Sequence, residues 1–138
     1  DIHFIKADIE NKGIGLESNQ FDIVYSKSLI EHLQNPELLF CEAYRLLKPG
    51  GKLVTLCPSW EHNYKWYYED YTHVSPFQKD SLRDIQVING FESIEVIFFK
   101  QLPILWGTGM QGLNLLSEMT RILVPDSFRS KHKWIKFS

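Results

Sequence analysis

The sequence lacks the features that define several large classes of protein. None of its apolar runs approaches the roughly 20 residues that a membrane-spanning helix needs, and no signal peptide is visible. Its two cysteines, Cys41 and Cys57, show no CxxC spacing and lie in apolar contexts, which predicts a reduced, cytoplasmic environment. The formal net charge of -2 gives no excess of basic residues and argues against nucleic acid as a partner.

The chain has 138 residues, 43% of them hydrophobic, and this is enough for one globular domain with a real core. Such a core needs no disulfide or structural metal for its stability. The chain begins at Asp1 rather than Met, and strand-like sequence stands at both ends, "DIHFIKADIE" and "KHKWIKFS". We therefore expect that both ends lie within a larger domain.

The hydrophobic pattern predicts strands and helices that alternate along the chain. Asn35 as a cap and Pro36 at the first helical position predict the start of one helix, and Gly90 predicts the end of another. The expected strands are 2–6, 21–26, 52–57 and 91–99, and the expected helices are 36–47 and 78–89. This order predicts an α/β domain with a mainly parallel sheet flanked by helices.

The C-terminal third departs from this pattern. Residues 107–112, "GTGMQG", match the phosphate-binding pattern G-x-G-x-x-G, but Pro103 interrupts the preceding apolar run and no strand ending in an acid follows. A nucleotide-binding oxidoreductase is kept as an alternative on this motif. A helix is expected over 113–123, followed by a basic tail. The helix either packs on its own domain or forms a cap near an acidic or membrane-borne substrate.

A dense polar cluster, "EDYTHVSPF", follows the most apolar strand. In it, His73 with Asp70 three residues earlier could form a general base and its orienting acid, or the cluster could serve only to cap the next helix. A metal site made of Glu61, His62, Asp70 and His73 fails on spacing, because neither a zinc pair nor HExxH is present, so no metal is expected. The absence of G-x-S-x-G argues against a serine hydrolase.

The segment "FDIVYSKSLIEHLQNPELLFCEAYRLLKPGGKLVTLCP" resembles the central part of the class I S-adenosylmethionine-dependent methyltransferases. The resemblance lies in an FD-x-V strand, an "IEHL" turn, a helix that ends in "RLLKPGG" and an apolar strand that ends in Pro, and it extends over about residues 2–99. It implies a Rossmann-like fold, S-adenosyl-L-methionine as the cofactor and a small-molecule acceptor, such as a sugar or a lipid-linked group.

Ligands of open parallel sheets bind beyond the carboxyl ends of the strands, and the candidate site residues follow those ends. By the resemblance, the cofactor would contact Asp8, Ile9, Ser26, Lys27, Ser28 and Leu29. The acceptor would lie near Glu31, Trp60 and Tyr71, with His73, Asp70 and His32 as the catalytic candidates. Alternatives stay open: Asp8 could close a turn, the two serines could satisfy strand-end backbone groups, and the "EH" pair could hold its loop together.

The family's glycine-rich loop after its first strand, and the acid after its second, have no counterpart before Asp1. We therefore interpret residues 1–138 as a single partial methyltransferase domain, its C-terminal part, with a core over 1–99 and a variable helix and basic tail over 100–138. By itself such a chain is expected to bind S-adenosylmethionine poorly. A catalytically inactive α/β module kept for protein interaction is the other alternative.

Overall fold

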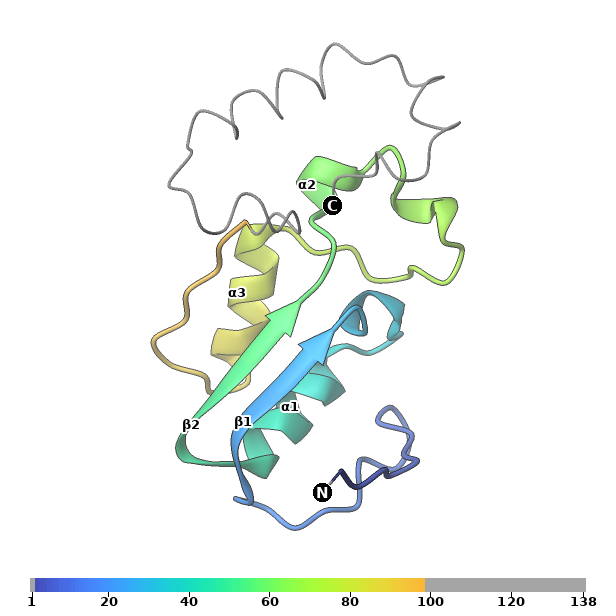
Figure 1. The fold of residues 1–138 in the computed structure, drawn as a ribbon. Helices are drawn as coiled ribbons and strands as arrows, with labels where there is room; N and C mark the ends of the chain where they lie inside the picture. The colour runs from blue at the N-terminus through green and yellow to red at the C-terminus, as the bar shows by residue number, and fades with distance from the viewer. Residues whose placement is uncertain (1, 99–138) are drawn as a thin grey trace. The chain divides into compact units, whose positions relative to one another are not determined.

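Two parallel strands with helices packed behind them form the centre of the structure (Figure 1). The computed structural model describes residues 2–98. Residues up to Ile97 belong to one compact unit, and residue 98 begins a second unit. The G-x-G-x-x-G match at 107–112, the helix expected over 113–123 and the basic tail lie outside the described residues.

The two strands are β1 (Phe21–Lys27) and β2 (Leu47–Leu56), and helix α1 (Glu37–Leu46) connects them. Their pairing is parallel, with Val24 opposite Leu53 and Ser26 opposite Thr55. This strand–helix–strand unit confirms the parallel α/β expectation. The backbone bend within the first half of β2 requires Gly51, because a Cβ atom there would lie 2.9 Å from the carbonyl oxygen of Lys48.

Helix α1 packs on the sheet through a stripe of apolar side chains spaced three and four residues apart. It begins one residue later than expected: Pro36 is the cap residue, and Asn35 contributes its backbone carbonyl, which accepts from the amide of Leu38, rather than a capping side chain. The buried residues of α1 are Leu39, Phe40, Ala43 and Leu46.

Helix α3 (Lys79–Ile88) confirms the second expected helix. Gln78 and Ser81 form a reciprocal capping box at its start, and Gly90 at φ +87° follows its end. Leu82 and Ile85 of this helix pack against a central apolar cluster that includes Phe77. The buried members of this cluster are Ile30, Leu33, Leu39, Phe40 and Phe77.

Two expected strands do not form. Residues 2–6 and 91–98 carry strand-like sequence, but neither segment is a strand in the structure. Phe4, for example, is 93% exposed. A strand exists only where a neighbour completes its hydrogen bonds, and β1 and β2 pair with each other in the sheet that the structure describes. The prediction was wrong because an apolar pattern indicates a preference for strand conformation but does not supply the neighbouring strand with which to pair.

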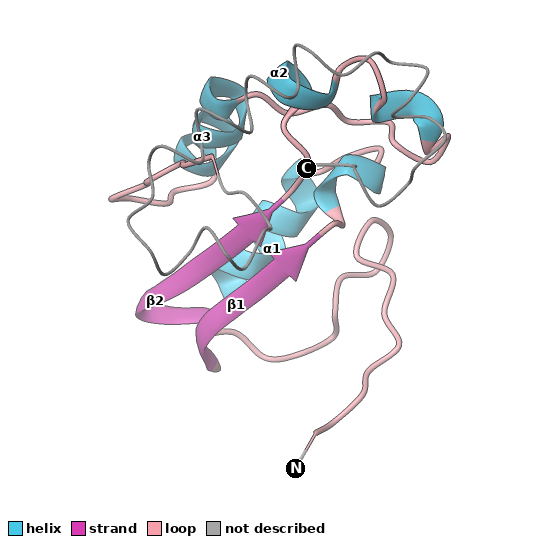
Figure 2. Cartoon of the chain, turned by 45° about the horizontal axis from the view of Figure 1, so that its top comes forward, coloured by secondary structure: helices cyan, strands magenta, loops and turns pink. Residues whose placement is uncertain are grey.

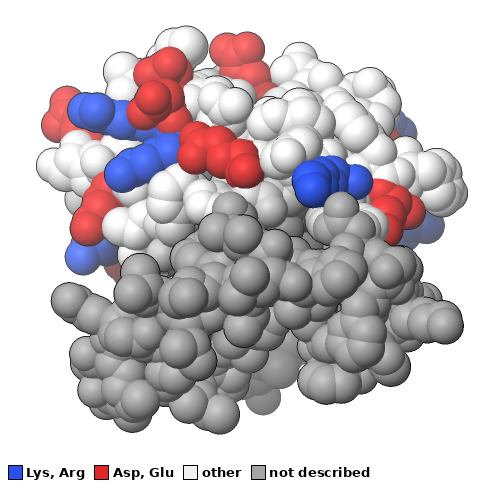
Figure 3. All heavy atoms as spheres, turned by 90° about the horizontal axis from the view of Figure 1, so that it is seen from above, with Lys and Arg blue, Asp and Glu red and all other residues white. Residues whose placement is uncertain are grey.

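The apolar sequence of β2 also predicted helices on both faces of the sheet. In the described residues, α1 and α3 cover the face that carries Leu53. On the opposite face Ile23, Tyr25 and Val54 are exposed. None of the helices within residues 2–98 is long and apolar enough to cross a membrane. Basic and acidic side chains are interspersed on the face shown in Figure 3, so the described part of this face has no large area of one sign.

Candidate functional site

The candidate site lies where the two parallel strands end, at the edge that points toward α2 (Trp60–Asn63) in Figure 2. After β1, Ser28 at φ +50° turns the chain into a short 3-10 helix, η1 (Ile30–His32), while its amide still donates to Leu56 at 3.0 Å. After β2, the chain enters α2 and a second 3-10 helix, η2 (Tyr67–Glu69). Both polar segments singled out in the sequence therefore start from the same edge of the sheet.

The segment 60–76 is closed at its base and folds back over η1. Ser59 and Phe77 form a parallel bridge, and the Trp60 amide donates to the Phe77 carbonyl at 2.9 Å. The amides of Val74 and Ser75 both donate to the carbonyl oxygen of Glu31, at 2.8 and 3.1 Å. These backbone bonds bring the "IEHL" turn and the "EDYTHVSPF" cluster, far apart in the sequence, into direct contact.

Both imidazoles of the site are held through Nδ1. His73 Nδ1 lies 2.7 Å from the Tyr67 carbonyl oxygen, which can only accept, so this nitrogen carries the hydrogen. His32 Nδ1 lies 2.8 Å from the Thr72 hydroxyl oxygen. That hydroxyl donates to Asp70 at 2.6 Å, so it accepts from His32. In their neutral forms both rings therefore present an unprotonated Nε2, and their centroids are 4.8 Å apart.

Asp70 acts on His32 through Thr72 rather than directly on His73 as the sequence suggested. Its carboxylate accepts from both the hydroxyl and the amide of Thr72, whereas its nearest approach to His73 Nε2 is 3.9 Å. These bonds from Thr72, together with the nearby imidazoles, lower the pKa of Asp70. The contact was missed in the sequence, although Asp followed two residues later by Thr is the spacing of an Asx turn.

Glu31 is buried beneath the imidazoles rather than facing an open acceptor space. The residue is 1% exposed, and its Oε2 atom has no hydrogen-bond partner in the described part of the chain. Its Oε1 atom lies 3.8 Å from His32 Nε2, beyond hydrogen-bond distance. Burial and this carboxylate together raise the pKa of the Cys57 thiol to about 12, so the thiol stays protonated near neutral pH.

An aromatic wall stands beside the imidazoles. Tyr67 is buried, donates its hydroxyl to the Ser75 carbonyl at 2.7 Å and lies 4.6 Å from the His73 ring. Trp60 packs edge-on against Tyr67 at 5.2 Å. Tyr71, the other aromatic acceptor candidate, is 89% exposed, so the structure does not bring it into this wall. Burial and the Glu31 charge raise the pKa of Tyr67, which keeps the phenol protonated.

The candidate cofactor residues lie at the same edge, in two groups. Ser26 is buried at the end of β1, and its hydroxyl has no hydrogen-bond partner among the described residues. Thr55 lies opposite Ser26 on β2, and its buried hydroxyl also has no hydrogen-bond partner among the described residues. Lys27, Ser28 and Leu29 follow and are exposed. Unsatisfied buried hydroxyls beside an accessible turn fit a polar ligand at this point.

Asp8 and Ile9 form the second group. Asp8 is exposed, and its carboxylate closes a turn by accepting from the Glu10 amide at 3.2 Å and from the Asn11 side chain at 2.8 Å. Ile9 packs against the apolar cluster that contains Ile30, the residue that opens η1. The turn function left open for Asp8 is therefore observed, while the position of Ile9 keeps this segment near the end of β1.

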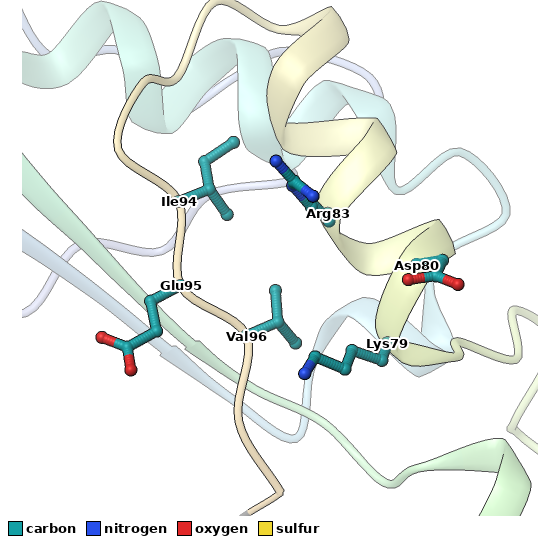
Figure 4. Close-up of a pocket in the computed structure, with 6 residues that line it drawn as sticks. All are labelled: Lys79, Asp80, Arg83, Ile94, Glu95 and Val96. Atoms are coloured by element: carbon teal, nitrogen blue, oxygen red, sulfur yellow. The ribbon is translucent and has the colours of Figure 1, made fainter.

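One pocket lies away from these residues, between the start of α3 and the segment after it (Figure 4). It has a volume of about 410 Å³ and mixes two cations, two acids and two aliphatic side chains. In Figure 4, Ile94 and Val96 point toward α3 and Glu95 points away from it. Its lining residues are Lys79, Asp80, Arg83, Ile94, Glu95 and Val96, none of which the sequence pattern singled out.

Comparisons with known proteins show that this chain is similar to methyltransferases. Residues 1–55 match the family model described as a methyltransferase domain. Over 38 residues the chain is 47% identical to phosphoethanolamine N-methyltransferase 2 of Caenorhabditis elegans, a match that covers 28% of this chain and 9% of that protein. Over 52 residues it is 40% identical to malonyl-[acyl-carrier protein] O-methyltransferase of Enterobacter lignolyticus, covering 38% of this chain and 20% of that protein. The chain thus spans only a small part of the curated relatives that it matches.

Two solved structures extend the likeness beyond the family model. A crystal structure of a Bacillus halodurans protein assigned as a methyltransferase superposes with a TM-score of 0.60 and 25% identity, over 93% of this chain and 60% of that one. An S-adenosylmethionine-dependent methyltransferase of Thermotoga maritima gives a TM-score of 0.56 and 27% identity, over 64% of this chain and 45% of that one.

Proposed function

Because this chain belongs to the class I S-adenosylmethionine-dependent methyltransferase family, we propose that the full-length protein transfers a methyl group from S-adenosylmethionine to a small-molecule acceptor. The observation that carries the proposal is the pair of imidazoles, His32 and His73, each held at Nδ1 with Nε2 left to face an acceptor. They lie at the strand edge where class I folds and other open parallel sheets bind their ligands.

The cofactor supplies an electrophilic methyl group on a sulfonium. In our proposal Ser26, Lys27, Ser28 and Leu29 hold its methionine side, and the segment of Asp8 and Ile9 holds the adenine side. The support is the unsatisfied Ser26 hydroxyl and the exposed turn after it. We propose that Asp8 keeps its turn while its outer carboxylate face meets the adenine amino group, with Ile9 against the ring.

The acceptor in this proposal is a hydroxyl or amine that approaches from the side of Trp60 and Tyr71. The Nε2 atom of His73 or His32 takes its proton as the new bond to carbon forms and the sulfur–methyl bond breaks. Alignment and exclusion of water supply most of the rate for such a transfer, and the aromatic wall serves both. An aromatic wall suits a sugar or a lipid-linked head group. In this proposal Glu31 supports the acceptor side through its charge beneath the imidazoles, 3.8 Å from His32 Nε2, rather than by direct contact.

The test uses the full-length protein, radiolabelled S-adenosylmethionine and a panel of amine, phosphorylated amine, sugar and acyl-carrier acceptors. Removal of a general base costs about 10²- to 10⁴-fold in rate. The variants His73→Ala and His32→Ala should therefore lower kcat by that amount, while the affinity for S-adenosylhomocysteine, measured by calorimetry, changes little. His3→Ala is the matched control, because His3 is exposed and far from the site in the sequence.

Two results would contradict the proposal. Equal losses of kcat and cofactor affinity in both histidine variants would assign the imidazoles a structural role. Failure of the full-length protein to bind S-adenosylhomocysteine at all would remove the cofactor assignment itself.

A further inference from the structure

Glu31, His32 and His73 form a compact group of metal-ligating side chains. One ligand atom from each lies within 4.8 Å of those of the other two. Glu31 and His32 come from η1, and His73 comes from the segment that the Val74 and Ser75 amides bind to the Glu31 carbonyl. No spacing rule applied to the sequence finds this set, because its members come from two separate segments.

The ligand atoms of this group all carry lone pairs, and none of them carries a hydrogen that could bond to another member of the group. His73 Nδ1 and His32 Nδ1 already donate to the Tyr67 carbonyl and the Thr72 hydroxyl, so each Nε2 carries a lone pair. The Glu31 Oε2 atom, on a residue 1% exposed, has no hydrogen-bond partner among residues 2–98. A buried carboxylate without a partner is costly, and the two imidazole lone pairs beside it supply no hydrogen, so the group favours a bound positive species.

We propose that Glu31, His32 and His73 bind one divalent transition-metal ion of the zinc class through the carboxylate and the two Nε2 atoms. Two imidazoles and a carboxylate are a ligand set typical of zinc and related ions, and a fourth position stays open for water or substrate. Tetrahedral ligand atoms around zinc lie about 3.3 Å apart, so the three side chains must close by up to about 1.5 Å on binding.

The residues behind the ligands fit this assignment. Metal-binding histidines usually donate their second ring nitrogen to a carbonyl or carboxylate, which fixes the ring and its tautomer. His73 has the Tyr67 carbonyl for this purpose, and His32 has the Thr72 hydroxyl backed by Asp70. The His32 side chain is 30% exposed, so the open position is accessible from solvent.

Only the catalytic role of the ion rests on the proposed function. An acceptor hydroxyl bound at the open position would lose its proton to water, because a divalent ion lowers the pKa of a bound oxygen. The resulting oxyanion then takes the methyl group as the sulfur–carbon bond breaks. With the ion bound, His32 and His73 are ligands, so the ion takes over the removal of the acceptor proton that the proposed function gives to Nε2 in the metal-free site. The metal titration below decides between these two routes. Binding of the ion itself does not depend on methyl transfer.

The experiment measures metal binding without cofactor or acceptor. Full-length protein without a histidine tag is stripped with EDTA, dialysed and titrated with Zn²⁺ by calorimetry, and separately with Co²⁺ by visible absorption. One equivalent should bind, and Co²⁺ should give weak ligand-field bands without thiolate charge transfer, since the set contains no cysteine. Glu31→Gln, His32→Ala and His73→Ala should each weaken binding more than 100-fold, while His3→Ala and Glu92→Gln should leave it unchanged.

Thr72→Val tests the site without removing a ligand and guards against misfolding of the ligand variants. It deletes the group that orients His32 and should weaken Zn²⁺ about 10- to 100-fold with an unchanged circular dichroism spectrum. Absence of Zn²⁺ binding, or binding that all three ligand variants leave intact, would overturn the proposal. So would an imidazolium at His32 or His73 in the ¹⁵N spectrum at neutral pH that Zn²⁺ does not displace. Retained Zn²⁺ binding without any methyl transfer would contradict only the proposed function.

Discussion

Replacement of Glu31 by Gln should stabilise the metal-free protein. The substitution keeps the shape of a side chain that is 1% exposed and removes its charge. It also places an amide donor where the carboxylate now lies 3.8 Å from His32 Nε2. Most buried substitutions destabilise, so a gain here would show that this carboxylate is kept for a purpose other than folding.

The magnitude follows from the one carboxylate oxygen that is buried without a partner. Leaving such a group unsatisfied costs about 1–3 kcal/mol, and more when it is charged. We therefore expect Glu31→Gln to raise the free energy of unfolding in EDTA by about 1–3 kcal/mol. With a urea m-value near 2 kcal/mol/M, the unfolding midpoint should rise by about 0.5–1.5 M.

Urea unfolding followed by tryptophan fluorescence measures this, with Glu92→Gln as the control for an exposed glutamate. The control should stay within about 0.5 kcal/mol of the parent protein. Zn²⁺ at 100 times its dissociation constant should then add about 2.7 kcal/mol to the parent and little to Glu31→Gln, which offsets most or all of the gain expected for the variant in EDTA. A Glu31→Gln variant less stable than its parent in EDTA would refute the reasoning, because the carboxylate would then have a favourable partner.

Three further predictions concern the fold, the acid limit of stability and the thiols. Phe40→Ala should lower the free energy of unfolding by about 3–5 kcal/mol in urea, because Phe40 is fully buried in the apolar cluster, and a loss below 1 kcal/mol would contradict that packing. The hydrogen bonds from Thr72 lower the folded-state pKa of Asp70, so their stabilisation is present above the unfolded-state pKa and is lost as pH falls through the folded-state value. Asp70→Asn should therefore flatten the acid limb of the melting temperature plotted against pH, and an unchanged limb would show that Asp70 does not contribute to it. At pH 8, iodoacetamide should modify exposed Cys41 well before Cys57, whose pKa is raised to about 12; equal labelling in peptide mass spectra would contradict the burial of Cys57.

The sequence predicted those elements whose signals are local. The apolar stripe of α1, the Gly90 stop after α3 and the β-branched run of β1 each determine structure within a few residues, and all three elements form. The segments 2–6 and 91–98 carry comparable apolar patterns, yet they are not strands in the structure. The difference is that a helix satisfies its own hydrogen bonds, whereas a strand depends on a neighbour that the pattern does not contain.

The candidate site shows the same division. The rule that ligands bind at the carboxyl ends of parallel strands, together with the resemblance to methyltransferases, selected His32, Asp70 and His73, which the structure brings together. Which of these side chains contact one another could not be predicted, because it depends on the hydrogen bonds that the amides of Val74 and Ser75 donate to the Glu31 carbonyl. The proposed metal-ligand set could not be predicted from the sequence for the same reason.

The closed base of segment 60–76 has a consequence for how acceptor choice can change. Its ends are joined by the Ser59–Phe77 bridge. Two of its backbone amides bind a backbone carbonyl of η1, and these bonds do not depend on which side chains the residues carry. Residues in such a loop can be substituted without a change in the pairing of the strands beneath it. Under the proposed function, these substitutions would change the side chains that contact the acceptor. If the protein has the proposed function, its acceptor range and fold stability can therefore evolve separately, with the few side-chain contacts beneath the loop kept unchanged.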